Sequence, residues 1–194
     1  GSFTYTGVRF ALGAFSILPL IIFRHKKEEK LNKNASSNIG RNKKDKFSKN
    51  LTVLKAGSIA GIILFVAAGL QQIGLEETTA GKAAFITGFY IILVPALGIF
   101  IKQKTGASTW VAAVFAIAGL YFISVKENFI VSRGDLLVFI CSFFFAVHIL
   151  FINSFTKRVD ALKLAFIQYL ACSILSLITA LFVEEIHLAG IIKA

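Results

Sequence analysis

Six apolar stretches, each about as long as a bilayer crossing, alternate with polar segments along the 194 residues. They cover roughly residues 4–23, 52–73, 83–101, 108–125, 136–153 and 164–183. A helix needs about 20 apolar residues to cross a membrane, and lipid admits only helices or closed barrels because every backbone amide must be paired. The apolar run from Ala56 to Leu70 lacks the alternation of a barrel strand. The pattern therefore predicts an all-α, polytopic membrane helix bundle with six transmembrane helices.

Composition and charge agree with this prediction. Hydrophobic residues make up 56% of the chain, compared with roughly 45–50% in soluble domains, and the mean hydropathy is +0.76. Between Arg24 and Lys55 stand 11 Lys or Arg and three acidic residues, so this segment carries +8 of the net charge of +11. Its core, 24–50, is rich in Asn and Ser and has a single aromatic residue, Phe47. We predict a disordered cytoplasmic loop facing anionic lipid, and no binding of nucleic acid.

Loop charge also predicts the topology. Basic residues dominate the segments 24–55, 102–107 and 154–163, whereas acidic residues follow the second and the sixth apolar stretch. Because basic loops stay on the cytoplasmic side, these three segments are predicted to be cytoplasmic and both ends of the chain to lie outside. The protein is accordingly predicted to be a multi-pass protein of the cytoplasmic (inner) membrane.

Small residues in two stretches predict close helix contacts. Gly57 and Gly61 are four residues apart in the second stretch, and the fourth contains Ala112, Ala116 and Gly119. Small residues at such spacing let two membrane helices approach each other closely.

Several motifs follow in a characteristic order. Gly-Leu-Gln-Gln-Ile-Gly-Leu-Glu-Glu-Thr-Thr at 69–79 is followed by Gly-Phe-Tyr-Ile-Ile-Leu-Val-Pro at 88–95. Further motifs are Val8-Arg9-Phe10, Trp110 to Tyr121, Gly134-Asp135-Leu136-Leu137, and His148 to Gln168 with its Arg158-Val-Asp160 loop. On these residues the chain resembles EamA-type members of the drug/metabolite transporter superfamily, over nearly its whole length except 24–50.

The resemblance implies a ten-helix architecture built from two inverted five-helix repeats. The six stretches resemble helices two to seven, so one helix is expected before Gly1 and three after Ala194. The chain contains no methionine, which also indicates that Gly1 is not the natural start. The first repeat is expected to cover residues 1–125 and the second to begin in 134–194. Six helices alone leave an incomplete cavity, and a chain of this length is expected to need a homodimer to build a pathway.

His148 and Gln168 are the main candidates for a site. Each lies about five residues from the cytoplasmic end of its stretch, hence about 8 Å deep. We predict that they face each other and form a hydrogen bond. The bond is either structural, worth about 0.6–2 kcal/mol, or part of a substrate or proton site, because polar groups inside a membrane are costly.

Further candidates lie in the second and third stretches. Lys82, at the outer start of the third, either extends outward to the headgroups or offers a positive charge to an anionic or zwitterionic substrate. Thr87 and Tyr90 lie near mid-depth, where Pro95 is predicted to kink the helix. Gln71 and Gln72 close the second stretch; at least one is expected to point inward, and Gln72 is the candidate.

Other chemistry finds no support in the sequence. The acidic residues stand at the ends of stretches, and Cys141 and Cys172 lack metal or redox spacing, so buried free thiols are predicted. The patterns GxSxG, HExxH, CxxC and the P-loop are missing from the sequence. We therefore predict no enzyme, no metal and no cofactor.

By resemblance, the protein is expected to be a secondary transporter. Its predicted task is to export a small organic metabolite, such as an amino acid or a drug-like solute, by alternating access between two repeats. Two alternatives stay open: a six-helix channel or scaffold subunit, and a non-functional gene fragment.

Overall fold

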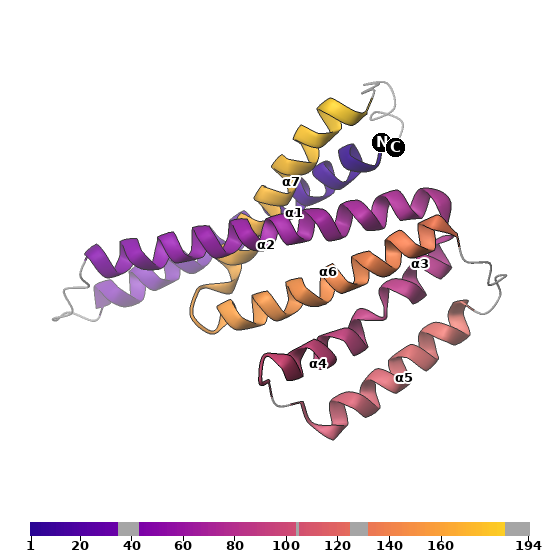
Figure 1. The fold of residues 1–194 in the computed structure, drawn as a ribbon. Coiled ribbons are helices and arrows are strands. Elements are labelled where there is room, and N and C mark those ends of the chain that lie inside the picture. Colours follow the sequence, from indigo (N-terminus) through magenta and orange to yellow (C-terminus); the bar gives the residue numbers. More distant parts are fainter. Residues whose placement is uncertain (35–42, 104, 125–131, 185–194) are drawn as a thin grey trace.

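The computed structural model describes residues 1–34, 43–103, 105–124 and 132–184, and all regular secondary structure in these ranges is helical (Figure 1). The helices are α1 (Ser2–Asn34), α2 (Lys43–Glu77), α3 (Ala80–Thr87), α4 (Tyr90–Phe100), α5 (Ala107–Ser124), α6 (Arg133–Thr156) and α7 (Ala161–Val183). The predicted helix bundle is therefore confirmed.

Five spans in the described part of the chain are long and apolar enough to cross a membrane. They are Ser2–Arg24, Asn50–Glu77, Ala80–Phe100, Arg133–Thr156 and Ala161–Val183. The sixth predicted span corresponds to α5, whose apolar part, Ala107–Gly119, is shorter. The third span contains both α3 and α4.

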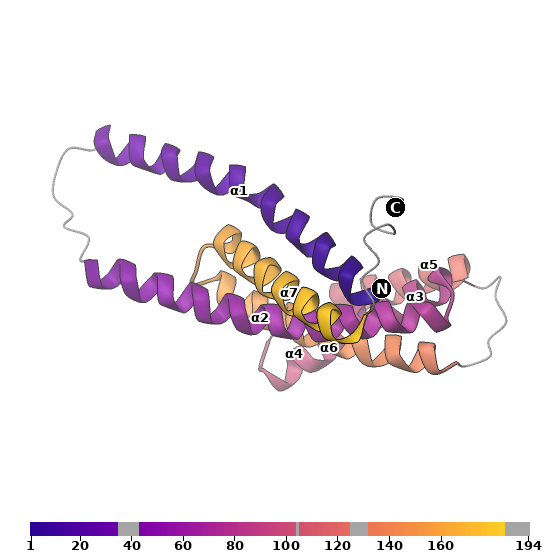
Figure 2. The ribbon, with the colours of Figure 1, turned by 90° about the horizontal axis from the view of Figure 1, so that it is seen from above.

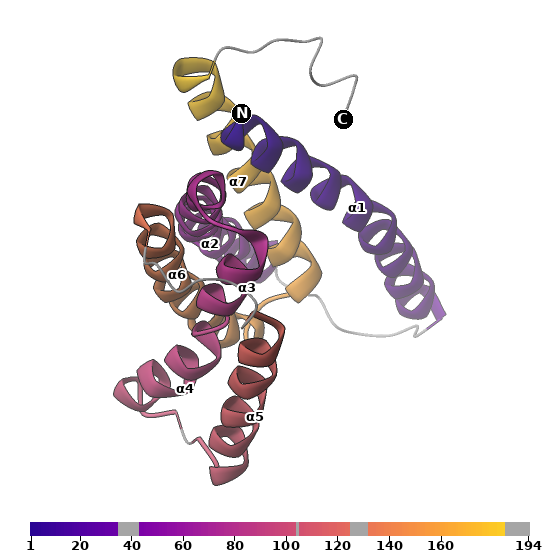
Figure 3. The ribbon, with the colours of Figure 1, turned by 90° about the vertical axis from the view of Figure 1, so that its right-hand side faces the viewer.

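Helices α2, α6 and α7 form the centre of the bundle. Helix α2 packs extensively against both α6 and α7, and α1 packs mainly against α7. The Ser173 hydroxyl of α7 donates a hydrogen bond of 2.9 Å to the Gly7 carbonyl oxygen of α1. Helices α3 and α4 cover another side of α6, and α5 lies against them at the edge of the bundle, away from α1 (Figures 1 and 3).

The bundle has two ends that we name by residues. The Glu184 end holds residues 1–4, 76–82, 132–135 and 184, and the Asp160 end holds the turns at 101–103 and 157–160 (Figure 1). Helix α1 lies near α7 at the Glu184 end and moves away from α2 toward its own C-terminal end (Figure 2). The described parts of all three segments predicted to be cytoplasmic lie toward the Asp160 end (Figure 1), and the side of the membrane that this end faces stays a prediction.

The prediction of a disordered loop over 24–50 is wrong for most of that segment. Helix α1 continues to Asn34, beyond the span that ends at Arg24, and α2 begins at Lys43, before the span that starts at Asn50. Lys, which is frequent in these extensions, favours helix, whereas Asn, Ser and Gly in 34–40 do not. Residues 35–42 lie outside the described residues.

The interruption of the third span is not at Pro95, as we predicted, but at Gly88 and Phe89. Helix α3 ends at Thr87, and α4 runs through Pro95 to Phe100. The Ile91 amide donates a hydrogen bond of 3.0 Å to the Gly88 carbonyl oxygen, three residues earlier. The Ile92 amide donates one of 3.0 Å to the Phe89 carbonyl oxygen in the same way. Glycine has a low helix propensity, and these tighter bonds mark a change in helix winding.

Glycines of α2 allow a close helix contact, as we predicted, and the structure shows that the partner is α7. A Cβ atom on Gly57 would lie 2.6 Å from Cγ2 of Ile167, and one on Gly61 would lie 2.8 Å from the backbone oxygen of Gln168. Both contacts are too short for any side chain, so the two helices meet at glycine.

The small residues of α5 do not play this role. Ala112 and Gly119 are exposed, and no described residue lies within 4 Å of a Cβ atom on Gly119. The prediction is wrong here because α5 has neighbours on one side of the bundle, and Ala113, one position away, is the residue buried on that side.

A second glycine contact, between α2 and α6, was not predicted. A Cβ atom on Gly134 would lie 2.6 Å from the Gly74 oxygen, and one on Gly74 would lie 2.8 Å from the Gly134 oxygen. Each helix contributes a single glycine to this contact, so no pair of glycines four residues apart marks it in the sequence. Cys141 and Cys172 are buried and free, as predicted.

Candidate functional site

Helix α6 carries polar residues along the face that it turns toward its neighbours. Asp135, Ser142 and His148 follow one another at about two helical turns. Asp135 and Ser142 are buried and His148 is half-buried. The Ser142 hydroxyl donates to the Phe139 carbonyl oxygen of its own helix at 2.7 Å. Asp135 and His148 instead reach other helices, so α6 connects polar contacts at different depths of the bundle.

His148 and Gln168 form the predicted hydrogen bond between α6 and α7. His148 Nε2 lies 3.1 Å from Gln168 Oε1. With Oε1 as the acceptor, Nε2 carries hydrogen, and a neutral ring then presents Nδ1 as an acceptor. Gln168 is only 5% exposed and its backbone lies against Gly61 of α2. Three helices therefore meet at this pair, which places an ionisable ring and an amide within the apolar spans; its role in transport stays a prediction.

Thr87 is joined to α2 by Gln71 rather than by Gln72. Gln71 Nε2 donates to Thr87 Oγ1 at 3.1 Å, and Thr87 is buried. Gln72, our candidate, is half-buried one position along. Adjacent helical residues point about 100° apart, so the sequence alone did not tell which glutamine faces α3.

Tyr90 lies directly after the interruption between α3 and α4. Its ring packs against Phe145 of α6, with 6.5 Å between ring centroids and an angle of 54° between the planes. Tyr90 is half-buried. Thr87 and Tyr90 thus flank the interrupted helix, the first contacting α2 and the second α6.

Lys82 forms an ion pair with Asp135, a partner that we did not predict. Lys82 Nζ lies 2.6 Å from Asp135 Oδ2, and the two side chains are 15% and 6% exposed. The Thr78 hydroxyl donates to Asp135 Oδ1 at 2.5 Å, and the Ser132 amide donates to Oδ2 at 2.9 Å. We predicted that Lys82 either extends outward to the headgroups or offers its charge to a substrate. Neither prediction describes this contact with Asp135. The spacing of Ser132 and Asp135, a capping box, was the sequence signal for the position of the carboxylate.

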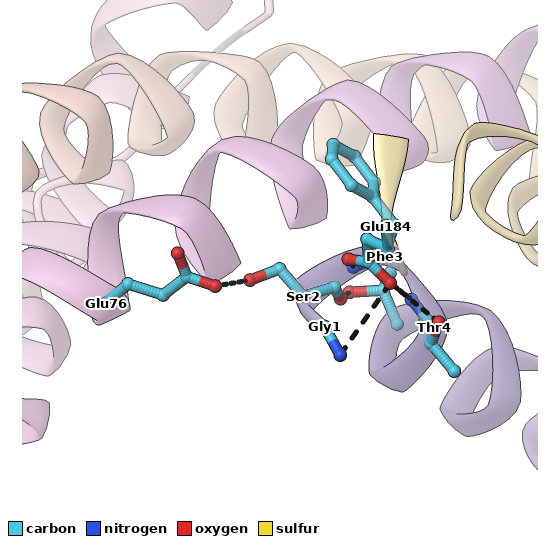
Figure 4. Close-up of polar contacts among 7 residues, drawn as sticks. Gly1, Ser2, Phe3, Thr4, Glu76 and Glu184 are labelled. Carbon is cyan, nitrogen blue, oxygen red and sulfur yellow. Dashed lines mark hydrogen bonds and ion pairs between the residues drawn. The ribbon is translucent and has the colours of Figure 1, made fainter. Parts of the chain in front are cut away.

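Glu184 ties the start of α1 to the end of α7 (Figure 4). Its Oε1 accepts from the Phe3 amide at 2.6 Å, and its Oε2 accepts from the Thr4 amide at 3.0 Å and the Thr4 hydroxyl at 2.6 Å. Nearby, the Ser2 hydroxyl donates to the Glu76 carboxylate of α2. A carboxylate also suits the positive N-terminal end of the α1 dipole. These contacts join α1, α2 and α7 at the Glu184 end.

The Glu184 contacts predict a pH-dependent stability. Burial raises the pKa of the Glu184 carboxyl, but the bonds from Thr4 and Phe3 outweigh burial and hold the pKa below its ordinary value. A lowered pKa in the folded state stabilises the protein above the ordinary pKa of the group, and this gain is lost as the pH falls through the lowered value. Glu184→Gln is therefore expected to lower the apparent melting temperature in detergent at pH 7 and to have a much smaller effect near pH 3. An equal effect at both pH values would contradict the ionic role of Glu184.

In the described residues, no group of three or more His, Cys, Asp or Glu side chains is placed to hold a metal ion. The polar groups of the candidate site are instead hydrogen-bonded in pairs between helices. Such an arrangement offers donors and acceptors to a solute once a pair separates.

Comparison with known proteins identifies a transporter family. The model of the EamA-like transporter family matches residues 1–125. A protein of Archaeoglobus fulgidus named as an uncharacterized transporter is 34% identical over 129 residues, which cover 66% of this chain and 41% of the relative. The aligned chain thus spans less than half the length of that relative. No solved structure matches the chain significantly.

Proposed function

Because the chain belongs to the EamA-like transporter family, we propose that its full-length protein is a secondary transporter that moves a small organic solute by alternating access. The family favours a membrane transporter over an enzyme. The observation that carries the finer proposal is the bond between His148 and Gln168. Transporter sites gather near the middle of the membrane, where polar groups serve the solute.

The interrupted third span supports the same location for the solute. Its break at Gly88 and Phe89 lies between Thr87 and Tyr90. Interrupted helices are typical of the solute sites of transporters. We propose that Thr87 and Tyr90 line the pathway on the α3–α4 side and that His148 and Gln168 line it on the α6–α7 side.

The proposed orientation places the Asp160 end in the cytoplasm. The helical extensions of α1 and α2 carry many of the basic residues of the chain, and basic segments stay inside. The membrane is then the cytoplasmic membrane, and the proposed direction of transport is export. The proposed partners are the solute and the lipid bilayer, with no nucleic acid. A ten-helix chain would form the pathway alone, whereas a shorter chain would need a homodimer.

Metabolite distribution tests this function. Cells that lack the full-length protein are expected to accumulate at least one small organic solute, and the gene restored on a plasmid is expected to lower its level inside and raise it in the medium. Mass spectrometry of cells and medium measures both pools. If no solute changes its distribution, the proposal of metabolite export is wrong.

A further inference from the structure

The two ends of the bundle differ in how firmly their helices are joined. At the Glu184 end, carboxylates of Glu184 and Asp135 accept hydrogen bonds of 2.5–3.0 Å from other helices or turns. At the Asp160 end, the described residues include an ion pair between Arg24 and Asp160 at 3.8 Å, with 55% of the Arg24 side chain exposed. Helix α1 also moves away from α2 toward that end (Figure 2). Among the described residues, short carboxylate contacts between helices therefore gather at the Glu184 end.

Asp135 is the central residue of the contacts between α3 and α6. It accepts from Lys82 Nζ of α3, the Thr78 hydroxyl before α3 and the Ser132 amide before α6. Asp135 is almost fully buried. Removing one partner of a buried ion pair leaves the other charge uncompensated, which is strongly unfavourable without water. Helices α3 and α6 can thus separate at this end only if water reaches both charges, and this requirement creates two discrete states.

A buried apolar cluster lies directly behind the ion pair. Ala83, Val138 and Cys141 form it, and each is at most 3% exposed. Cys141 stands six residues after Asp135 on α6, or about 9 Å further into the membrane at 1.5 Å per residue. On its other side, α3 is joined to α2 by the hydrogen bond between Gln71 and Thr87. Anything that enters between α3 and α6 from the Glu184 end meets Lys82 and Asp135 before Cys141.

We propose that the Lys82–Asp135 ion pair is a latch that closes the pathway at the Glu184 end. When paired, it holds α3 against α6 and keeps water from the cluster around Cys141. When the pair opens, α3 moves away from α6 and the pathway becomes accessible from that end. This proposal rests on the proposed transport function, and the closed latch belongs to the state that opens toward the Asp160 end.

The native cysteines provide the test in the full-length protein. A small charged methanethiosulfonate, which does not cross lipid, is added to intact cells, and mass spectrometry follows the modification of the peptides with Cys141 and Cys172. Both thiols are fully buried. Lys82→Met and Asp135→Asn are each expected to speed the modification of Cys141 by about tenfold or more, while Cys172 stays slow. Thr78→Val, which removes a bond to Asp135 but keeps the ion pair, is the matched control and is expected to have a smaller effect.

Two results would overturn the latch. Unchanged modification of Cys141 in both variants shows that the pair does not control access. Equal acceleration at Cys141 and Cys172 shows that the pair only supports the fold, because Cys172 lies on α7, away from the α3–α6 contact. Modification does not depend on transport. Faster modification of Cys141 in a protein that transports no solute would therefore support the latch and contradict the transport function. Unchanged modification of Cys141 in a protein that does transport a solute would contradict the latch alone.

Discussion

Gly134→Ala is expected to destabilise the protein more than Gly74→Ala, the corresponding substitution on the other side of the α2–α6 contact. The new Cβ atom would lie 2.6 Å from the Gly74 oxygen and 2.9 Å from Cβ of Glu77. The first neighbour is backbone, so it moves only if α2 and α6 separate. Forcing extra atoms into a packed contact costs about 1–3 kcal/mol, and occasionally more. We expect a clear drop in the apparent melting temperature and in the folded yield in detergent.

Gly119→Ala is the matched control for this prediction. Gly119 also lies in an apolar helix, but no atom in the described part of the chain is within 4 Å of the position that its new methyl group would take. Alanine favours helix over glycine by about 1 kcal/mol. The control is therefore expected to be neutral or slightly stabilising. If Gly134→Ala behaves like Gly119→Ala, the close approach of α2 and α6 is wrong.

His148→Ala is expected to lower solute transport by about tenfold or more, which corresponds to about 1.4 kcal/mol of lost stabilisation. The substitution removes the ring and leaves the buried Gln168 amide without its partner. Gln168→Ala is expected to have a similar effect, and the double variant to be little worse than either, because the two residues act as a unit. Uptake or efflux of the solute identified in the export experiment provides the measurement.

His148→Gln separates binding from proton transfer. Glutamine is able to hydrogen-bond with Gln168 but does not titrate. Recovery of transport in this variant indicates a binding role, whereas continued loss indicates that the ring carries a proton. Normal transport by a folded His148→Ala protein would show that the bond is structural, worth about 0.6–2 kcal/mol to the helix contact.

Several features were predictable because they depend on one helix or on the length of a stretch. The apolar lengths predicted the spans, of which the described residues hold five of membrane length and a shorter sixth apolar helix. The close helix contact at Gly61 followed from glycine spacing, although its partner α7 did not, and the bond between His148 and Gln168 followed from their equal depth. The boundary between the two repeats, expected between 125 and 134, remains a prediction.

Other features depend on which helices become neighbours. A lipid-facing surface is as apolar as a packed surface, so hydrophobic periodicity does not tell which side of a membrane helix is buried. This explains why Gly119 was expected in a contact and why Gln72 was chosen over Gln71. The partner of Lys82 was missed for the same reason, since Asp135 lies 53 residues later and meets it only through the packing of α3 on α6.

The contact between α1 and α7 has a consequence for biosynthesis. Helix α1 is made well before α7, the last described helix, whose Ser173 bonds to Gly7. Because 166 residues separate the two, translation at about 5–20 residues per second delays that meeting by about 8–33 seconds. Until then α1 lacks its main partner, and the glycines of α2 at positions 57 and 61 face lipid or the insertion machinery. A chain whose synthesis ends before Ala161 would therefore leave the α7-contacting glycines of α2 uncovered in the membrane, and we expect membrane-protein quality control to recognise it.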